Sequence, residues 1–277
     1  MASMVDGALL EATRERVLAW FAQAGRDLPW RATRDPYRVL VAEVLAQQTQ
    51  AARAAAAWPR FLEQFPDVGS LAAAPPAEVL RAWQGLGYNR RALALRRTAQ
   101  AVVERGGWPE TVEELAALPG VGPYTAAAVA SFAFGRDVAA VDTNVRRVCE
   151  RLGRGTPADL LPPGRAAAFN QAMMDLGATV CRARNPHCSD CPVAPWCASR
   201  GRVEAPPRRP ARATRFEDTS RWARGRVVAA LAAGEGVPQD VPAERLRKAV
   251  AGLERDGLVV LGADDAPRLP DFQDTVL

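Results

Sequence analysis

The chain is nearly devoid of lysine. Of its 36 basic residues, only Lys248 is a lysine and the other 35 are arginines. An enzyme that forms an imine with its substrate needs an amine nucleophile, which lysine ordinarily supplies. The first 247 residues therefore contain no side chain suited to Schiff-base chemistry, which argues against an imine-forming lyase.

Long hydrophobic runs are also missing. No apolar stretch reaches the roughly 18 residues of a membrane span, and the N-terminus lacks the apolar core of a signal peptide. Hydrophobic residues still make up 48% of the chain, enough for an ordinary core. We expect a soluble, cytoplasmic protein without a membrane partner. The net charge of +5 and the pI near 9.3 favour a polyanionic partner.

Alternating strand patterns are absent from the first 200 or so residues. Apolar residues recur there at helical spacing in segments that glycine and proline separate, which predicts a mainly α fold. The predicted helices cover residues 8–24, 37–50, 51–64, 77–83, 89–105, 111–117, 123–134, 142–151, 164–179 and 189–198.

The composition changes near residue 205. Residues 205–212 are rich in proline and arginine and predict an extended basic linker. Beyond it we expect helices near 219–233 and 242–256, then a hairpin with a strand at 257–261, a turn at 262–265 and a return through Arg268 and Leu269. Two helices followed by a hairpin suggest a small winged-helix-like module over 213–277. Its arginines, together with those of the linker, predict either a clamp on a nucleic acid backbone or a solvated basic face on a small stabilising module.

Four of the five cysteines lie close together in the sequence. Their spacing is Cys181-x6-Cys188-x2-Cys191-x5-Cys197, and four thiolates suit either a tetrahedral zinc ion or a four-iron cluster. The single short knuckle with longer flanking gaps favours the cluster. We interpret His187, beside Cys188, as a loop residue.

Residues 118–122, Leu-Pro-Gly-Val-Gly, separate two predicted helices. Thr111 begins the first helix with a capping box, and Pro123 occupies the first position of the second. Gly120, Val121 and Gly122 leave backbone N–H groups free at a helix N-terminus, where they can hold a phosphate without reading sequence. The alternative is an ordinary turn between two helices.

Two carboxylates lie in unusual surroundings. Glu43 is the only acid in a predicted apolar helix, where loss of water raises the pKa of a carboxyl and suits a general acid. Asp142 precedes another helix, as a helix cap or as a catalytic carboxylate. Cleavage of a glycosidic bond needs one protonated and one ionised acid, which these two residues could supply if they meet in space.

Several motifs together resemble the MutY-type adenine DNA glycosylases of the helix-hairpin-helix, iron–sulfur superfamily. The resemblance covers about residues 10–200 and includes the cysteine spacing of the family's four-iron cluster. It rests on Leu28-Pro29-Trp30-Arg31, RDPYRVLVAEVLAQQTQ (34–50), GLGYNRRA (85–92), LPGVGPYTAAAV (118–129), AVDTNVRRV (140–148) and FNQAMMDLGATVC (169–181).

The resemblance implies a domain plan. A six-helix barrel with the helix-hairpin-helix would occupy 28–138. An iron–sulfur domain would occupy 139–204 and be completed by the N-terminal helix in 1–27, with DNA between the two domains. The resemblance covers neither the linker nor the winged-helix-like module.

The resemblance also assigns roles to residues. Glu43 would protonate the adenine of a flipped-out nucleotide, and Asp142 would stabilise the sugar cation while water attacks. Tyr124 and Asn144 would line the site, and Asp175 would support the pocket. The expected DNA contacts are Trp30, Arg31, Gln47, Gln48, Thr49, Tyr88 and the hairpin residues Gly120, Val121 and Gly122.

We therefore expect a monofunctional glycosylase that acts as a monomer on double-stranded DNA containing a mispair and removes adenine opposite 8-oxoguanine or guanine. In related strand-nicking enzymes a lysine occupies the position of Tyr124. A thymine-removing mismatch glycosylase with tyrosine at that position is one alternative, and a non-catalytic iron–sulfur DNA-binding protein is another. The roughly 65 residues after the linker are too few for the family's Nudix-like reader domain, so we expect a short form.

Overall fold

The computed structural model describes residues 7–203, 215–271 and 274. The predicted basic linker, with Arg208, Arg209 and Arg212, lies outside the described residues. The chain divides into two compact units, each formed by discontinuous segments. Of the described residues, unit 1 comprises 7–43, 109–117 and 121–203, and unit 2 comprises 44–108, 118–120, 215–271 and 274. Among the described helices, none combines the length and apolar character needed to cross a bilayer.

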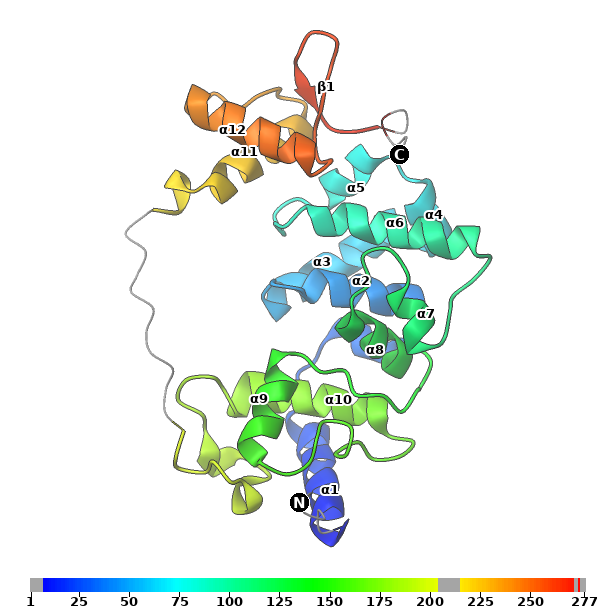
Figure 1. Cartoon of the computed structure of the whole chain (residues 1–277), viewed down its shortest axis with the longest axis vertical. Helices are drawn as coiled ribbons and strands as arrows, with labels where there is room; N and C mark the ends of the chain where they lie inside the picture. The colour runs from blue at the N-terminus through cyan, green and yellow to red at the C-terminus, as the bar shows by residue number, and fades with distance from the viewer. Residues whose placement is uncertain (1–6, 204–214, 272–273, 275–277) are drawn as a thin grey trace. The chain divides into compact units, whose positions relative to one another are not determined.

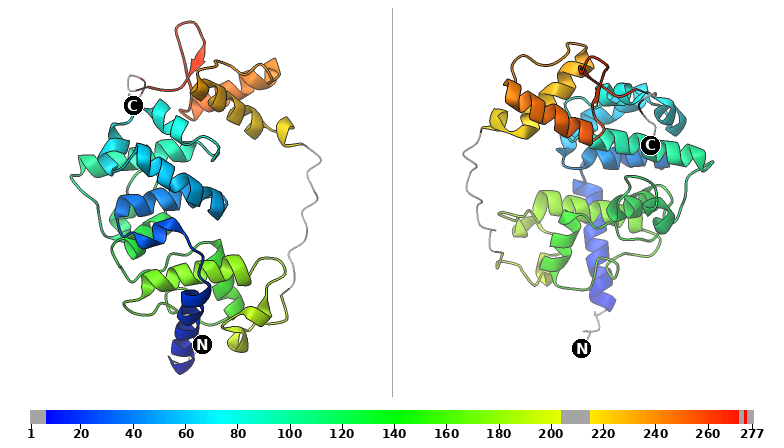
Figure 2. Two further views of the ribbon diagram at one scale, coloured as in Figure 1. Left: turned by 180° about the vertical axis from the view of Figure 1, so that it is seen from behind. Right: turned by 45° about the horizontal axis from the view of Figure 1, so that its top comes forward.

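Unit 1 is helical, with a core that draws on both its beginning and its end. Val17 on the first helix packs with Leu152, Phe169 and Leu176 in one buried cluster. In both views of Figure 2 the first helix (blue) crosses the helix that carries Phe169, and the two helices are in contact. The helices of unit 1 are α1 (Gly7–Ala24), α7 (Val112–Ala116), α8 (Pro123–Phe132), α9 (Thr143–Leu152) and α10 (Ala166–Asp175) (Figure 1). The helix α2 (Pro36–Ala46) begins in unit 1 and ends in unit 2.

Short turns complete unit 1. The 3-10 turn η1 (Pro29–Ala32) precedes α2, and the π-helical turn η2 (Leu176–Val180) continues α10. The cysteine-rich segment that follows contains the 3-10 turns η3 (Cys188–Asp190) and η4 (Ala194–Trp196). The helix predicted over 189–198 is therefore wrong. Pro192 and Pro195 lack the backbone N–H that a continuous helix would need.

The first part of unit 2 contains α3 (Ala51–Gln64), α4 (Val68–Ala73), α5 (Pro76–Ala82) and α6 (Arg90–Glu104). Trp83 is fully buried at the end of α5, and its ring meets Phe61 edge-on with 5.7 Å between centroids. Helix α4 was not predicted. It is short, and Asp67 and Ser70 form a capping box at its start.

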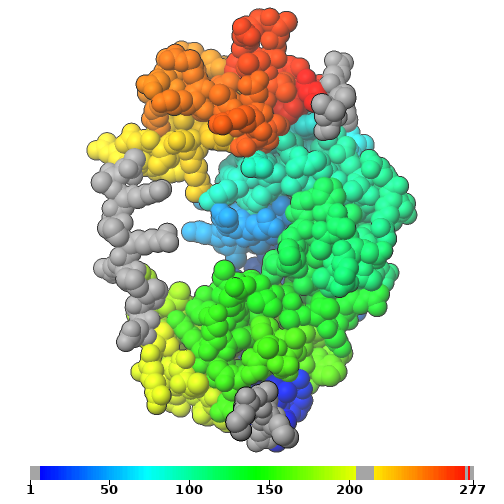
Figure 3. All heavy atoms as spheres, viewed as in Figure 1, coloured from blue at the N-terminus to red at the C-terminus, as the bar shows by residue number. Residues whose placement is uncertain are grey.

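The C-terminal segment of unit 2 consists of the turn η5 (Phe216–Asp218), the helices α11 (Ser220–Ala233) and α12 (Ala243–Arg255) and the strands β1 (Val260–Leu261) and β2 (Pro267–Arg268). The strands pair antiparallel, so the predicted hairpin is confirmed. Helix α11 packs on α12 and on α5, and Gln84 donates to the Ala229 carbonyl at 3.4 Å. Figure 3 shows these residues (yellow to red) against the cyan residues of α5 and α6. The winged-helix type stays a prediction.

Helix boundaries followed local signals in most places. Thr111, Pro123 and Asp142 begin their helices as predicted, and the mainly α fold is confirmed. The helix predicted over 37–50 instead ends at Ala46, because Gln48 takes a left-handed backbone angle (φ 52°) that no helix accommodates. The Arg91 guanidinium donates to the carbonyls of Val44 (2.8 Å) and Gln47 and thereby stabilises this helix end.

Candidate active site

Glu43 lies in α2. The other side chains of this helix near Glu43 are apolar and buried. Val39, Leu40, Val44 and Leu45 are each at most 5% exposed, and Glu43 itself is 9% exposed. A carboxyl that buried has lost most of its water. The sequence-based expectation of a desolvated acid at this position therefore agrees with the structure.

Burial raises the pKa of Glu43 to about 7. Hydrogen bonding with Tyr124 works against this rise, and the nearby charge of Asp142 adds to it. Tyr124 lies in the first turn of α8, and burial together with the neighbouring Glu43 raises the pKa of its phenol. The phenol is thus a neutral hydrogen-bonding group, and Glu43 can hold a proton near neutral pH.

Asp142 caps α9 and is fixed through both carboxylate oxygens. Its Oδ1 accepts from the backbone N–H groups of Asn144 (2.8 Å) and Val145 (2.7 Å), and its Oδ2 accepts from the Asn144 side-chain amide (2.8 Å). The helix-cap interpretation and the catalytic one are therefore compatible. The cap holds a half-buried carboxylate in one orientation near Glu43 and Tyr124.

Asp175 is fully buried at the end of α10 and paired with two arginines. Arg31 Nη2 donates to it at 2.7 Å, and Arg26 donates through its backbone N–H (2.8 Å) and its Nε (2.7 Å). Burial by itself would raise the pKa of Asp175, but the hydrogen bonds from Arg31 and Arg26 outweigh it and hold the pKa below its ordinary value. The sequence analysis did not single out Arg26. Trp30 is half-buried in η1, next to Arg31.

A second arginine that the sequence analysis missed lies behind Asn144. Arg147 donates to Asn144 Oδ1 (2.7 Å), to the Gly177 carbonyl (2.6 Å) and through its Nε to the Cys181 carbonyl (2.8 Å). Gly177 is required here, because a Cβ at this position would lie 2.6 Å from the Cβ of Asn144. The only sequence signal for Arg147 was that it lies one helical turn after Asn144.

The four clustered cysteines line one small pocket of unit 1. Cys181, Cys188, Cys191 and Cys197 are half-buried free thiols. Burial is the largest cause that raises the pKa of Cys191, and the three neighbouring cysteines add to the rise. The Arg151 Nη1 approaches Cys181 Sγ at 3.4 Å. In the part of the chain that the structure describes, neither these thiols nor any other group of His, Cys, Asp or Glu side chains is arranged to bind a single metal ion.

The predicted phosphate site falls between α7 and α8, which pack against each other. Gly120 has a φ of +84°, and a Cβ there would lie 2.8 Å from the Cβ of Ala94, so only glycine fits. Gly122 caps α8 and is exposed, whereas Val121 is buried. The N–H groups at the start of α8 thus belong to a tight turn with a Pro at the first helical position.

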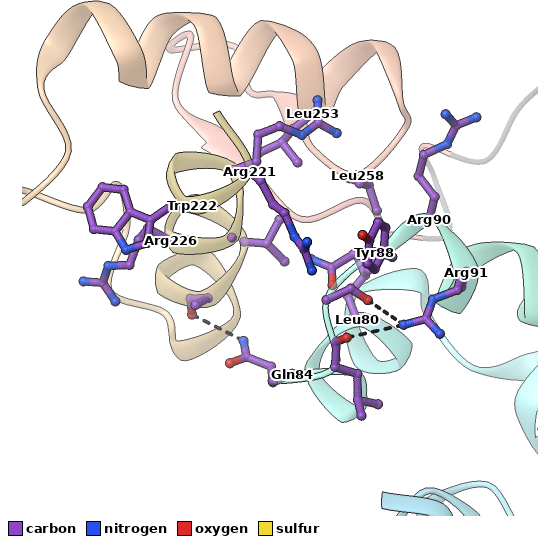
Figure 4. A pocket seen from close by; sticks show the side chains of 18 of the residues that line it. Leu80, Gln84, Tyr88, Arg90, Arg91, Arg221, Trp222, Arg226, Leu253 and Leu258 are labelled. Carbon is purple, nitrogen blue, oxygen red and sulfur yellow. Dashed lines mark hydrogen bonds between the residues drawn. The ribbon is translucent and has the colours of Figure 1, made fainter. Parts of the chain in front are cut away.

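The remaining candidates gather in unit 2. Gln47, Gln48 and Tyr88 line a pocket of about 860 Å³ together with residues of α11. Figure 4 labels Tyr88 and, on α11, Arg221, Trp222 and Arg226. Thr49 lies in the same turn, and Arg91 Nη2 donates to its hydroxyl at 3.3 Å. Arg91 also donates to the Gly87 carbonyl at 3.0 Å and so links the turn after α2 to the loop that carries Tyr88. Glu43, Tyr124 and Asp142 do not line this pocket.

Comparison with known proteins identifies the family. The family model described as "HhH-GPD superfamily base excision DNA repair protein" matches residues 41–160. The adenine DNA glycosylase of Mycobacterium tuberculosis is 43% identical over 241 residues, which cover 79% of this chain and 78% of that protein.

Solved structures share the fold. A thermostable thymine-DNA glycosylase superposes with a TM-score of 0.66 at 31% identity and covers 70% of this chain and 97% of its own. Endonuclease III in a non-covalent complex with DNA superposes with a TM-score of 0.61 at 26% identity, covering 72% and 98%. This chain belongs to the adenine DNA glycosylase family, within the HhH-GPD superfamily of base excision DNA repair proteins.

Proposed function

We propose that this protein is a monofunctional adenine DNA glycosylase that hydrolyses the N-glycosidic bond of adenine mispaired with 8-oxoguanine or guanine. The observation that carries the proposal is the buried Glu43, whose pKa is raised to about 7, beside Tyr124 and the fixed carboxylate of Asp142. A protonated acid and a second carboxylate are the pair that glycosidic cleavage needs. The relative from M. tuberculosis is named an adenine DNA glycosylase.

In this mechanism Glu43 delivers its proton to the adenine ring, which makes the base a better leaving group. The carboxylate of Asp142 stabilises the positive charge that develops on the sugar as the N-glycosidic bond breaks, until a water molecule adds to the sugar carbon. Three hydrogen bonds keep this carboxylate in place. Asn144 and Tyr124 orient the two acids. Arg31 and Arg26, held by Asp175, support the wall of the site.

The product of this reaction is an intact strand with an abasic site. Tyr124 has no amine, and Lys248, the single lysine, lies in α12 of unit 2 and pairs with Glu244. We expect no covalent complex to be trapped by borohydride during turnover and strand nicking only after alkali or heat. Efficient trapping at any residue would contradict the monofunctional assignment.

Cys181, Cys188, Cys191 and Cys197 fit a four-iron cluster, because they are four thiols around one pocket in a single loop. A bound cluster would cross-link this loop and add a charged group to it. Arg151 would donate to the ligand sulfur of Cys181, as it does in this structure. Iron and zinc analysis of anaerobically purified protein tests the assignment. About four irons per chain is expected, and stoichiometric zinc without iron would contradict it.

Double-stranded DNA is the proposed partner, with the protein acting as a monomer in the cytoplasm. The similarity to endonuclease III in a DNA complex supports DNA binding, as does the net charge of +5. The turn at Gly120 and Gly122 would hold a backbone phosphate at the start of α8.

A thymine glycosylase is the second candidate, favoured by the similarity to the thermostable thymine-DNA glycosylase. A base-release panel separates the two. Duplexes carry adenine or thymine opposite guanine, 8-oxoguanine or cytosine, and the released base is quantified. Release of adenine opposite 8-oxoguanine or guanine is expected. Release of thymine alone would favour the second candidate, and tight binding without release would indicate a non-catalytic DNA-binding protein.

A further inference from the structure

The hydroxyl of Tyr124 has two hydrogen-bonding partners, which come from different helices. One is Glu43 of α2. The other is Met174, near the end of α10, whose thioether sulfur accepts from the phenol at 3.8 Å. All three residues belong to unit 1. The phenol therefore connects the buried acid with a methionine that the mechanism above does not use.

Packing keeps the sulfur of Met174 beside the phenol. Both side chains lie against the same small buried cluster, which Ala127, Ala128 and Ala140 form, and α8 and α10 are in contact. Met174 is half-buried and also packs against the larger core cluster of unit 1. An unbranched, flexible thioether can fill such a junction between two clusters.

A phenol has only one proton to donate, but its oxygen can accept as well. When Glu43 is ionised, its carboxylate is the stronger acceptor and takes the hydrogen bond of the phenol. When Glu43 is protonated, the carboxyl can donate its own proton to the phenol oxygen, and the phenol proton then needs another acceptor. A thioether is a weak acceptor, so Met174 serves when Glu43 is neutral and yields when Glu43 is charged.

Two other acids and two arginines face this region from the neighbouring elements, and they are engaged elsewhere. Asp142 accepts three hydrogen bonds from the start of α9 through both of its oxygens. Asp175, which follows Met174, is paired with Arg26 and Arg31. In the part of the chain that the structure describes, the phenol proton thus has the sulfur of Met174 as its acceptor whenever Glu43 is neutral.

We propose that Met174 is a positioning residue that holds the proton on Glu43, because its sulfur accepts from Tyr124 and leaves the phenol oxygen free to accept from the carboxyl. When adenine takes the proton, Glu43 becomes a carboxylate and the Tyr124 hydroxyl turns from the sulfur to donate to it. The transfer to adenine rests on the proposed function, whereas the chain of hydrogen bonds is a property of the free protein.

Replacing the sulfur should move a titration. Met174→Leu keeps an apolar side chain of similar volume and removes the acceptor. It removes support from the protonated form of Glu43 and none from the carboxylate, so the pKa of Glu43 should fall by about half a pH unit, the size of one weak hydrogen bond. Single-turnover excision from about pH 5 to pH 9 should then decline at a correspondingly lower pH, with the rate on the acid side within about twofold of wild type.

A direct titration of the carboxyl needs no turnover. Protein labelled with ¹³C at the glutamate carboxyl is titrated by NMR without DNA, and the Glu43 signal is assigned by its loss in Glu43→Gln. In the wild type this signal should titrate near pH 7. In Met174→Leu it should titrate about half a pH unit lower.

Met173→Leu is the matched control, since Met173 is the neighbouring methionine of α10 and is buried in the larger core cluster. It should leave the titration of Glu43 and the pH profile of excision unchanged. In a Tyr124→Phe background, Met174→Leu should cause no further change, because the phenol that links sulfur and carboxyl is gone. If Met174→Leu does not fold, norleucine in place of methionine exchanges only the sulfur for a methylene and should lower the pKa equally.

The inference is overturned if Glu43 titrates in Met174→Leu as it does in the wild type. A fall of the same size in Met173→Leu, or in Met174→Leu on the Tyr124→Phe background, would also overturn it, because the effect would then not pass through the phenol. Failure of the proposed function looks different. A wild-type protein that releases no adenine would contradict the glycosylase assignment, and the NMR titration would still decide the role of Met174.

Discussion

Glu43 and Arg221 are both titratable residues next to a tyrosine, but their surroundings differ. Glu43 is 9% exposed and has Tyr124 and Asp142 as polar neighbours, so loss of water dominates its chemistry. Arg221 is exposed and lies on Tyr88 at the edge of a wide pocket, where solvent screens its charge. Burial raises the pKa of Glu43 and so suits this carboxyl to proton transfer, whereas the exposed guanidinium of Arg221 keeps its N–H donors accessible.

Removing the proton donor of the buried region should have the largest effect. Glu43→Gln keeps the shape of the side chain and lacks the acid, so single-turnover excision should fall by at least roughly 100-fold. DNA binding should persist. Glu63→Gln makes the same change on the exposed face of α3 and should leave excision unaltered. Excision by Glu43→Gln within a few-fold of wild type would refute the general-acid assignment.

A substitution of Asp142 can distinguish its role as a helix cap from a catalytic role. Asp142→Asn retains a good helix cap but loses the negative charge, so excision should fall by about 100-fold while stability changes little. Asp67→Asn makes the same change at the cap of α4 and should preserve excision. A large loss of thermal stability in Asp142→Asn without a specific loss of excision would leave only the helix-cap role.

The protonation of Glu43 should appear in both activity and stability. Excision should decline as the pH rises above about 7, because the acid then loses its proton. Between pH 4.5 and 7 the folded protein keeps a proton that the unfolded chain releases, so the free energy of unfolding should fall as the pH rises.

Above pH 7 this stability loss should reach about 3 kcal/mol, and Glu43→Gln should lack it. Urea unfolding of both proteins from pH 4 to pH 8 measures the difference. An unfolding free energy that differs between the two by the same amount at every pH would contradict a raised pKa for Glu43.

The smallest effect, on thermal stability, is expected from an exposed ion pair of the C-terminal segment. Arg226 and Asp240 form a salt bridge at 2.9 Å that solvent surrounds. Arg226→Ala should therefore leave the thermal unfolding midpoint unchanged within measurement error. A clear drop would show that charges in the C-terminal segment stabilise the fold, which would weaken the contrast with Glu43.

Local signals predicted much of the fold. Thr111, Pro123 and Asp142 begin their helices as expected, because the cap and the first turn depend only on neighbouring residues. One prediction failed where a distant contact decides, because Arg91 stabilises the end of α2 from another helix. The helix predicted over 189–198 failed for a local reason, because Pro192 and Pro195 interrupt that segment.

The sequence by itself determined the family motifs, the absence of lysine near the site and an acid, Glu43, inside an apolar helix. Only the tertiary structure decided that Asp142 and Tyr124 meet Glu43, because side chains from three helices converge through packing that spacing along the chain does not encode. It also decided that α11 lies beside Tyr88 and that the Arg221 guanidinium lies over the Tyr88 ring, whereas Arg224 and Arg226 pair with carboxylates. Partners distant in the sequence determine which charges are paired, and folding selects those partners.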